Sequence, residues 1–254
     1  GIKVRLPKGQ FIHPKDVSGP FRMGRKIVYT GDTRPFRVFT EFAEGADLLI
    51  HDATLDDGLA DRAEEDGHST PSQAAETAKK AGCNVGVTTN AMLLDDAALS
   101  RLVEQQIDIV AFSLAGADDL NDRLRRGTSL ETVLNAARLL HLKKEEYGSR
   151  RPAIHIAYLL LRSTMDNLDR LPDLLKDTGV TQVVISTLDL VASKELEVEA
   201  IAPITMDEYQ ALRSKLDAVA QQARHFNIDV HYQIRYPGTR RPVCTENVLR
   251  ALFV

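Results

Sequence analysis

The sequence predicts an α/β protein with a mostly parallel sheet, or a partial (β/α) barrel, built from about seven strand–helix units. Short apolar runs alternate with longer amphipathic segments along the chain, which is typical of this fold class. The runs are nearly continuous, as at 109–112 and 183–185, and parallel strands buried on both faces have this character. No low-complexity segment or composition shift marks a linker. We therefore expect one continuous domain.

The individual elements follow from local patterns. Residues 1–24 are expected to be loop-like because prolines and glycines interrupt any period, and 56–67 read as a polar, acidic loop. Ser129 is a plausible N-cap, and Gly82 suits the left-handed C-cap of the helix before it. The expected strands are 26–30, 46–50, 85–89, 107–114, 153–161, 182–188 and 228–234. The expected helices are 35–44, 72–81, 95–105, 129–146, 168–176 and 206–225.

Composition narrows the functional classes. With 43% hydrophobic and 27% charged residues, the 254-residue chain has the profile of a globular protein. A net charge of −4 gives no general attraction to nucleic acid or to an anionic membrane. No apolar run approaches the ~20 residues of a membrane helix, and the start does not resemble a signal peptide. The two cysteines, Cys83 and Cys244, favour a reducing cytoplasm and form no CxxC pattern.

Polar motifs follow the first two expected strands. Gly31-Asp32-Thr33-Arg34-Pro35 comes after the first, and His51-Asp52-Ala53-Thr54 after the second, while His68-Ser69-Thr70 precedes a helix. A carboxylate at a strand end followed by histidines suits metal binding or proton transfer. On spacing alone, the more frequent explanation is a strand-end histidine at 51 and a helix cap at Ser69 or Thr70.

The segments GRKIVYTGDTRP, ADLLIHDAT and GHSTPSQAAETAKKAG together resemble the C-terminal part of tRNase Z, a zinc-dependent tRNA 3′-processing endonuclease of the metallo-β-lactamase fold. The resemblance implies that Asp32 binds zinc and that His68 serves in proton transfer, with Arg34 and Thr70 in supporting positions. Asp52 departs from the family, which usually carries Glu there. The HxHxDH zinc motif of the family is absent from the sequence, so we expect the hydrolytic site to be inactive.

A second group of polar residues lies at later strand ends. These are Thr88-Thr89-Asn90, Ser113-Leu114-Ala115-Gly116-Ala117 and Ser186-Thr187-Leu188-Asp189, and three arginines, Arg123, Arg125 and Arg126, follow the second of them. Small and hydroxylated residues there suit a ligand approached by backbone, and arginine suits a carboxylate. Without further context, ordinary turn chemistry accounts for the same residues.

The stretches VTTNAMLLDDAALSRLV, IDIVAFSLAGADDLNDRLRRG, PAIHIAYLLLRST and LPDLLKDTGVTQVVISTLD resemble the middle and end of a radical S-adenosylmethionine enzyme with a SPASM-type extension. The resemblance implies that Ser113 and an arginine near Arg123 lie beside S-adenosylmethionine, with Asn90 lining the same cavity. The tail RRPVCTENVLRALFV looks like the start of the SPASM segment, which makes Cys244 a candidate auxiliary iron–sulfur ligand. The CxxxCxxC triplet that holds the [4Fe–4S] cluster is absent.

The two resemblances meet near residue 82. We expect residues 1–82 to be a tRNase Z-like βαβα segment and residues 83–254 a radical S-adenosylmethionine-like partial barrel. Right-handed crossovers would place both in one sheet, with Ile50 and Val87 on neighbouring parallel strands. The expected function is that of a catalytically incomplete hybrid, able to bind a nucleotide-like ligand at the strand C-termini, with no other partner identified. The alternatives are a radical oxidoreductase completed by cysteines from elsewhere, and a zinc-dependent endonuclease acting on tRNA.

Overall fold

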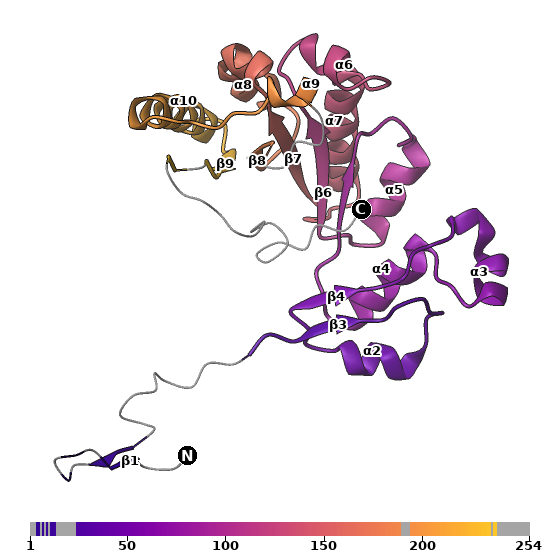
Figure 1. The fold of residues 1–254 in the computed structure, drawn as a ribbon. Helices are drawn as coiled ribbons and strands as arrows, with labels where there is room; N and C mark the ends of the chain where they lie inside the picture. Colours follow the sequence, from indigo (N-terminus) through magenta and orange to yellow (C-terminus); the bar gives the residue numbers. More distant parts are fainter. Residues whose placement is uncertain are drawn as a thin grey trace. The chain divides into compact units, whose positions relative to one another are not determined.

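The computed structural model describes residues 24–188, 194–234 and 236–237, together with residues 4–5, 7, 9 and 11–13. Contacts between residues divide the chain into two compact units, Gly1–Cys83 and Asn84–Val254 (Figure 1). Each unit is described by itself below. The prediction that the two pack as one continuous domain stays a prediction.

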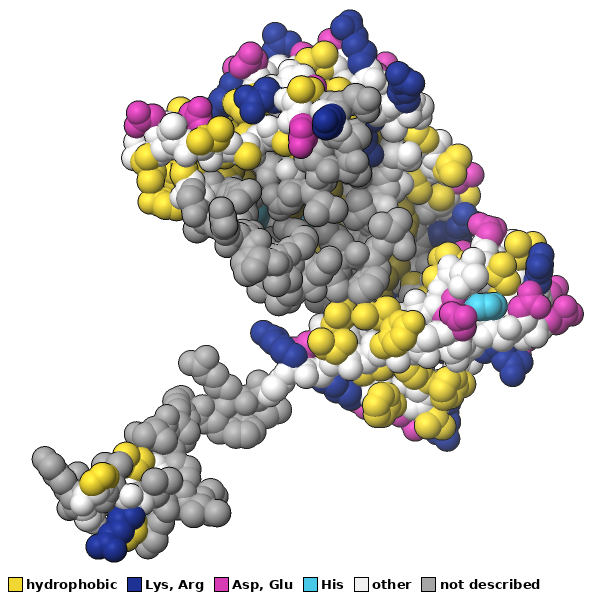
Figure 2. Space-filling view, in the orientation of Figure 1, with side chains coloured by type: hydrophobic (Ala, Val, Ile, Leu, Met, Phe, Trp, Pro, Cys, Tyr) yellow, Lys and Arg dark blue, Asp and Glu magenta, His cyan; other side chains and the backbone are white. Residues whose placement is uncertain are grey.

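The first unit is built around a short parallel pair of strands. β3 (Ile27–Tyr29) pairs with β4 (Leu48–Ile50), and α2 (Arg37–Ala43) connects them. A small core forms on one face of this pair, from Val28, Phe39, Ala43 and Ala81. The other face is open, because Ile27 is 64% exposed and Tyr29 is 72% exposed. Hydrophobic side chains accordingly gather over β3, β4 and α2 in Figure 2. Nearer the N-terminus, β1 (Val4–Arg5) pairs antiparallel with β2 (Phe11–Ile12).

The predicted acidic loop at 56–67 is wrong, since most of this segment is helical. η1 (Asp57–Leu59) leads into α3 (Ala60–Asp66). The Asp56 side chain caps η1 by accepting a hydrogen bond from Gly58 N at 2.8 Å, and Gly67 ends α3 in the left-handed conformation. Only Ala63 of α3 is buried, so the segment lacks the apolar stripe by which a helix is recognised in a sequence.

The next helix, α4 (Pro71–Lys80), has the ends that the sequence predicts. Thr70 is its N-cap and forms a reciprocal capping box with Gln73, while Pro71 occupies the first turn. Gly82 follows the helix with φ of +76°, a conformation that glycine adopts without a Cβ clash.

The second unit contains a five-stranded parallel sheet in the order β5-β6-β7-β8-β9. The strands are β5 (Gly86–Thr89), β6 (Ile109–Leu114), β7 (Ala153–Leu160), β8 (Gln182–Thr187) and β9 (Asp229–Tyr232). The helices are α5 (Asp96–Glu104), α6 (Leu120–Leu124), α7 (Leu130–Glu146), η2 (Arg162–Arg170), α8 (Leu171–Leu175), α9 (Lys194–Glu197) and α10 (Met206–Arg224). Alternating strands and helices with a mostly parallel sheet confirm the predicted fold class, and the described strands form no closed barrel.

The main core lies on one face of this larger sheet. Buried and half-buried residues alternate along β6 and β7, because successive side chains point to opposite faces of the sheet. Phe112, Ile156 and Tyr158 are among the fully buried side chains. α7 buries Val133 and Leu140 and begins at the predicted N-cap, Ser129, whose side chain accepts from Thr132 N. Among the described residues, no helix combines the length and the apolarity needed to cross a membrane.

The prediction of a single sheet through residue 82 is wrong. β3 and β4 pair only with each other among the described strands, whereas β5 pairs with β6, so Ile50 and Val87 are not on neighbouring strands. Hydrogen bonds at the start of β5 tie it to β6, because Val85 N donates to Asp108 Oδ2 at 2.8 Å and Asp108 N donates to Val85 O at 2.9 Å. An apolar run therefore identified each strand correctly but did not identify its partner.

Candidate functional site

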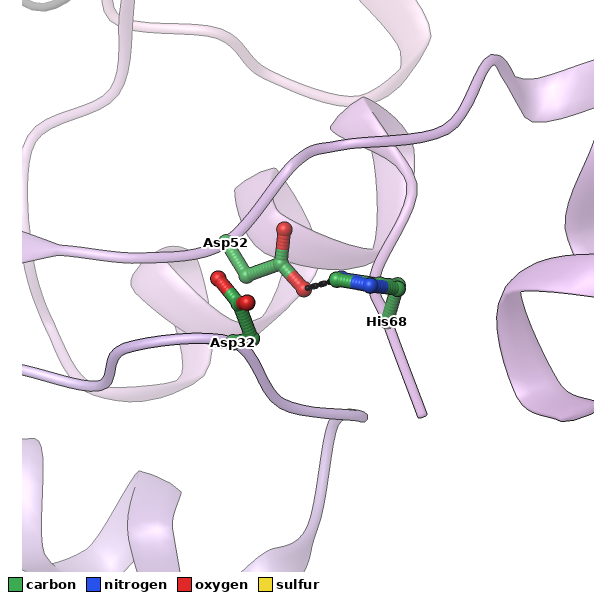
Figure 3. A group of neighbouring side chains, drawn as sticks. All are labelled: Asp32, Asp52 and His68. Carbon is green, nitrogen blue, oxygen red and sulfur yellow. Dashed lines mark hydrogen bonds and ion pairs between the residues drawn. The ribbon is translucent and has the colours of Figure 1, made fainter. Parts of the chain in front are cut away.

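Three ionisable side chains meet at the C-terminal ends of the first parallel pair. Asp32 follows β3, Asp52 follows β4, and His68 lies between α3 and α4 (Figure 3). Their ligand atoms all lie within 4.8 Å of one another, although the first and the last, Asp32 and His68, are 36 positions apart in the sequence. The carboxyl ends of parallel strands are the usual place for ligands in α/β folds, and these residues converge there.

Asp52 is the centre of the cluster, and its side chain is only 2% exposed. Oδ2 accepts hydrogen bonds from Thr33 N at 3.2 Å, His68 Nδ1 at 2.9 Å and Ser69 N at 3.0 Å. Oδ1 accepts from both the backbone N and the hydroxyl of Thr54. Burial by itself raises the pKa of Asp52, but the hydrogen bonds from Thr54, His68, Thr33 and Ser69 outweigh it and hold this pKa well below its usual value. Asp52 is therefore a fixed anion.

The bond to Asp52 determines the tautomer of His68. An ionised carboxylate only accepts, so the proton must reside on Nδ1 of His68. Its Nε2 has no hydrogen-bond partner among the described residues and remains a base or a ligand. A carboxylate that orients an imidazole in this way is common at metal sites. Asp32, on the other side, is exposed and makes no hydrogen bond or ion pair within the described part of the chain (Figure 3).

These residues fit part of a zinc site. A catalytic zinc normally has three protein ligands and one open position. Asp32 and Nε2 of His68 are available, whereas both oxygens of Asp52 are already occupied by hydrogen bonds. The cluster thus offers two free ligands, one fewer than a catalytic zinc requires, and we derive no hydrolytic step through the metal.

His51 takes no part in the cluster. It directly follows β4, its Nδ1 lies 2.8 Å from the carbonyl oxygen of Asp52, and its ring packs edge-on against Phe39 at 5.4 Å. This is the strand-end histidine that spacing alone favours. Its Nε2 is buried and has no hydrogen-bond partner among the described residues.

A pocket of about 510 Å³ lies beside the cluster. One wall is formed by residues 32–36, which connect β3 to α2, and the other by Glu64 and Gly67 from the end of α3. Arg34 joins the two walls, since one of its guanidinium nitrogens donates to Glu64 Oε1 at 2.9 Å and also to the Glu64 carbonyl oxygen at 3.3 Å. Asp32 belongs to both the pocket and the cluster.

In the second unit the predicted residues are partly brought together. Ser113, half-buried, lies near the end of β6, and Asn90 directly follows β5, the neighbouring strand. Asn90 is exposed and its Oδ1 accepts from Met92 N at 3.1 Å, which is the turn role expected without a ligand. Arg123 is exposed and pairs with Asp119 at 2.5 Å. Cys244 and Asp189 lie outside the described residues.

Two residues that follow β6, Arg125 and Asn121, were not singled out as site residues from the sequence. Arg125 is half-buried, its Nε is buried without a partner, and burial lowers the pKa of its guanidinium. Asn121 is fully buried and accepts a hydrogen bond from Ala115 N at 2.9 Å, which fixes the turn after β6. Both residues belong to the segment NDRLRRG, which follows β6. This position is a signal for a site, but the sequence does not indicate which of the three arginines in the segment is buried.

Comparison with known proteins finds ribonuclease Z by sequence over part of the chain and, by fold, solved structures that include SuiB of Streptococcus suis. Ribonuclease Z of Halobacterium salinarum is 47% identical over 90 residues, which are 35% of this chain and 29% of that enzyme. Ribonuclease Z of Methanothermobacter thermautotrophicus is 50% identical over 82 residues, 32% of this chain and 26% of that enzyme. The chain thus spans less than a third of the length of these relatives. No protein-family model matches it.

The structural comparison concerns the fold. Streptococcus suis SuiB aligns with a TM-score of 0.50 at 12% identity, over 82% of this chain and 48% of SuiB. Methylornithine synthase (PylB) aligns with a TM-score of 0.41 at 11% identity, over 85% of this chain and 73% of that protein. At such low identity the likeness to SuiB shows the parallel α/β arrangement alone. Together, the partial match to ribonuclease Z and the fold likeness to SuiB are consistent with the chimera-like resemblance predicted from the sequence.

Proposed function

We propose that this chain is a hybrid α/β protein in which a ribonuclease Z-type site for metal binding and proton transfer is joined to a radical S-adenosylmethionine-type sheet. Both sites are catalytically incomplete in this proposal. The observation that carries it is the convergence of Asp32, Asp52 and His68, whose ligand atoms lie within 4.8 Å of one another. The partial match to ribonuclease Z supports the same chemistry.

In the first site, each residue has a distinct role. Asp32 supplies an exposed carboxylate for zinc. His68 receives or delivers a proton at Nε2, and Asp52 fixes its ring through the 2.9 Å bond to Nδ1. With two free ligands, the site binds zinc weakly and does not cleave the 3′ trailer of precursor tRNA by itself.

Zinc titration tests this proposal. Calorimetry on the full chain should give weak zinc binding that Asp32→Ala and His68→Ala each reduce further, with Asp56→Ala as a matched control for a nearby carboxylate. Precursor tRNA incubated with zinc and the chain should stay intact. Efficient 3′ cleavage that disappears in Asp32→Ala would overturn the incompleteness, and zinc binding unaffected by either substitution would overturn the site.

The second unit carries its own candidate function, binding of S-adenosylmethionine or a similar nucleotide at the C-terminal ends of β5 and β6. Ser113 and Asn90 lie on neighbouring strands there. Arg125 replaces Arg123 as the proposed partner of the carboxylate, because the Arg125 side chain is half-buried with an unpartnered Nε, whereas Arg123 is exposed. Arg125→Gln should weaken S-adenosylmethionine binding in equilibrium dialysis and Arg123→Gln should not. Equal effects of the two substitutions would contradict the assignment.

Metal content separates the hybrid from its alternatives. Tightly bound iron after anaerobic purification would favour a radical oxidoreductase completed by cysteines from elsewhere, with Cys244 as one auxiliary ligand. Tight zinc together with tRNA cleavage would favour an active tRNA-processing endonuclease. The hybrid predicts neither metal in stoichiometric amount. A cytoplasmic location is part of the proposal, because the two cysteines form no CxxC pattern and suit a reducing compartment.

A further inference from the structure

The pocket next to the cluster has the size and lining of a nucleotide site. Its volume of about 510 Å³ lies within the range of small-molecule sites. Its lining combines an aromatic ring, Phe36, with a guanidinium, Arg34, and two carboxylates, Asp32 and Glu64. Aromatic rings stack on nucleobases whatever the base, and arginine binds phosphate oxygens in a planar, two-pronged geometry.

Phe36 is unusual in being a large aromatic side chain left accessible beside a cleft. It is 50% exposed, and its ring packs against Phe39 at 5.6 Å with the planes tilted by 49°. Phe39 is buried in the core, so the contact holds Phe36 from one side. A ring that is supported in this way, yet half exposed, can take a flat ligand without first being ordered.

Arg34 is held by a replaceable partner. The Arg34–Glu64 pair lies at 2.9 Å, but both side chains are more than half exposed, at 54% and 64%. Exposed ion pairs of this kind are weak, so a phosphate can compete with Glu64 for the guanidinium at little cost. The carboxylates in the lining repel an anion, which means that a cation on Asp32 should strengthen phosphate binding.

The position of the pocket fixes which part of a substrate it would hold. Asp32 lines the pocket and is also a member of the cluster, and Gly67 in the opposite wall directly precedes His68. A phosphodiester at Asp32 and His68 would therefore place an adjoining nucleoside in the pocket.

We propose that this pocket is a nucleotide subsite, in which Phe36 stacks on the base next to the bound phosphodiester and Arg34 leaves Glu64 to contact a phosphate. This subsite rests on the proposed function, because the phosphodiester is placed by the ribonuclease Z-type cluster. The ligand class is a short single-stranded RNA. Arg34 and Phe36 act as positioning residues that determine where the strand lies.

The test is calorimetric titration of the full chain with the dinucleotide CpA, without zinc and with zinc at a concentration that saturates the cluster. Phe36→Leu, which keeps an apolar contact with Phe39 but removes the ring, should weaken CpA binding about tenfold. Arg34→Gln should also weaken it, and more strongly in the absence of zinc. Two matched controls should bind as the parent does. These are Phe42→Leu, an exposed phenylalanine within α2, and Arg37→Gln, an arginine paired with Glu41.

Unchanged affinity in Phe36→Leu, or equal losses in Phe36→Leu and Phe42→Leu, would overturn the subsite. The zinc titration described above is measured separately and reports on the cluster alone. Zinc binding through Asp32 without CpA binding would mean that the subsite fails while the proposed function stands. CpA binding that depends on Phe36 but is unaffected by zinc would mean that the pocket binds nucleotides and the ribonuclease Z-type site fails.

Discussion

Replacing Asp52 by asparagine should destabilise the first unit by about 3 kcal/mol. The best arrangement of an asparagine puts its carbonyl oxygen at the Oδ2 position, facing Thr33 N, His68 Nδ1 and Ser69 N. Those three bonds survive but lose the charge of the acceptor, and charge-assisted bonds exceed neutral ones by roughly 1 kcal/mol each. The amide NH2 at the Oδ1 position can no longer accept from Thr54 N, so about 3 kcal/mol is the lower limit of the effect. Solvent screening does not reduce this figure, because the Asp52 side chain is only 2% exposed.

Amide hydrogen exchange is the appropriate assay, because it reports on each unit separately. Protection of the amides of Ser69 and Thr33 should fall by roughly 150-fold in Asp52→Asn, which corresponds to about 3 kcal/mol. Asp56→Asn is the matched control. Its carboxylate accepts only from Gly58 N at a helix start, where asparagine caps as well as aspartate does. Equal protection of Ser69 in the two variants would refute the view that Asp52 organises this site, and a similar loss in β6 would show a global effect instead.

Three further predictions concern pH, packing and iron. The stabilisation from Asp52 should be fully present above its unfolded pKa of about 3.9 and be lost as the pH falls towards its lower folded value. Amide protection in the first unit, corrected for the intrinsic exchange rate at each pH, should therefore fall below about pH 4, and less so in Asp52→Asn. Gly116→Ala should cost roughly 1–3 kcal/mol in urea unfolding, because its Cβ would lie 2.8 Å from the backbone nitrogen of Asn121. Gly86→Ala, whose Cβ would meet nothing closer than 3.5 Å, is the control and should change stability by less than about 1 kcal/mol. Anaerobic reconstitution should leave no stoichiometric [4Fe–4S] cluster and no reductive cleavage of S-adenosylmethionine, since the sequence lacks the cysteine triplet. A stable cluster absorbance together with 5′-deoxyadenosine would contradict this.

The elements of the fold could be predicted because they depend on local patterns. Thr70 and Ser129 cap their helices, and Gly82 takes the left-handed conformation, as their positions in the sequence indicate. Strand pairing could not be predicted in the same way, because it depends on side chains that are distant in the sequence. The apolar run at 27–29 predicts a strand buried on both faces, yet Ile27 and Tyr29 are largely exposed.

Only part of the candidate site could be predicted from the sequence. Resemblance, and not spacing, indicated that Asp32 and His68 belong to one site, and the structure brings them together with Asp52. The central role of Asp52 depends on five donors from three segments, which no local pattern reveals. Arg123 lies in α6 and Arg125 directly follows this helix, so their positions in the sequence are nearly equivalent. Only the burial of the two side chains distinguishes them.

The end of α4 has a consequence for how such a chain can arise. Gly82 N donates to Lys79 O at 3.0 Å and Cys83 N donates to Ala78 O at 2.9 Å, so the helix is finished by its own residues. Two residues later, Val85 N already donates to Asp108 of the second unit. A genetic crossover between codons 83 and 84 would therefore divide neither a helix cap nor the beginning of a strand. Gene fusion at this point can exchange one folded segment for another while each keeps its backbone hydrogen bonds, which makes it a natural breakpoint for recombination.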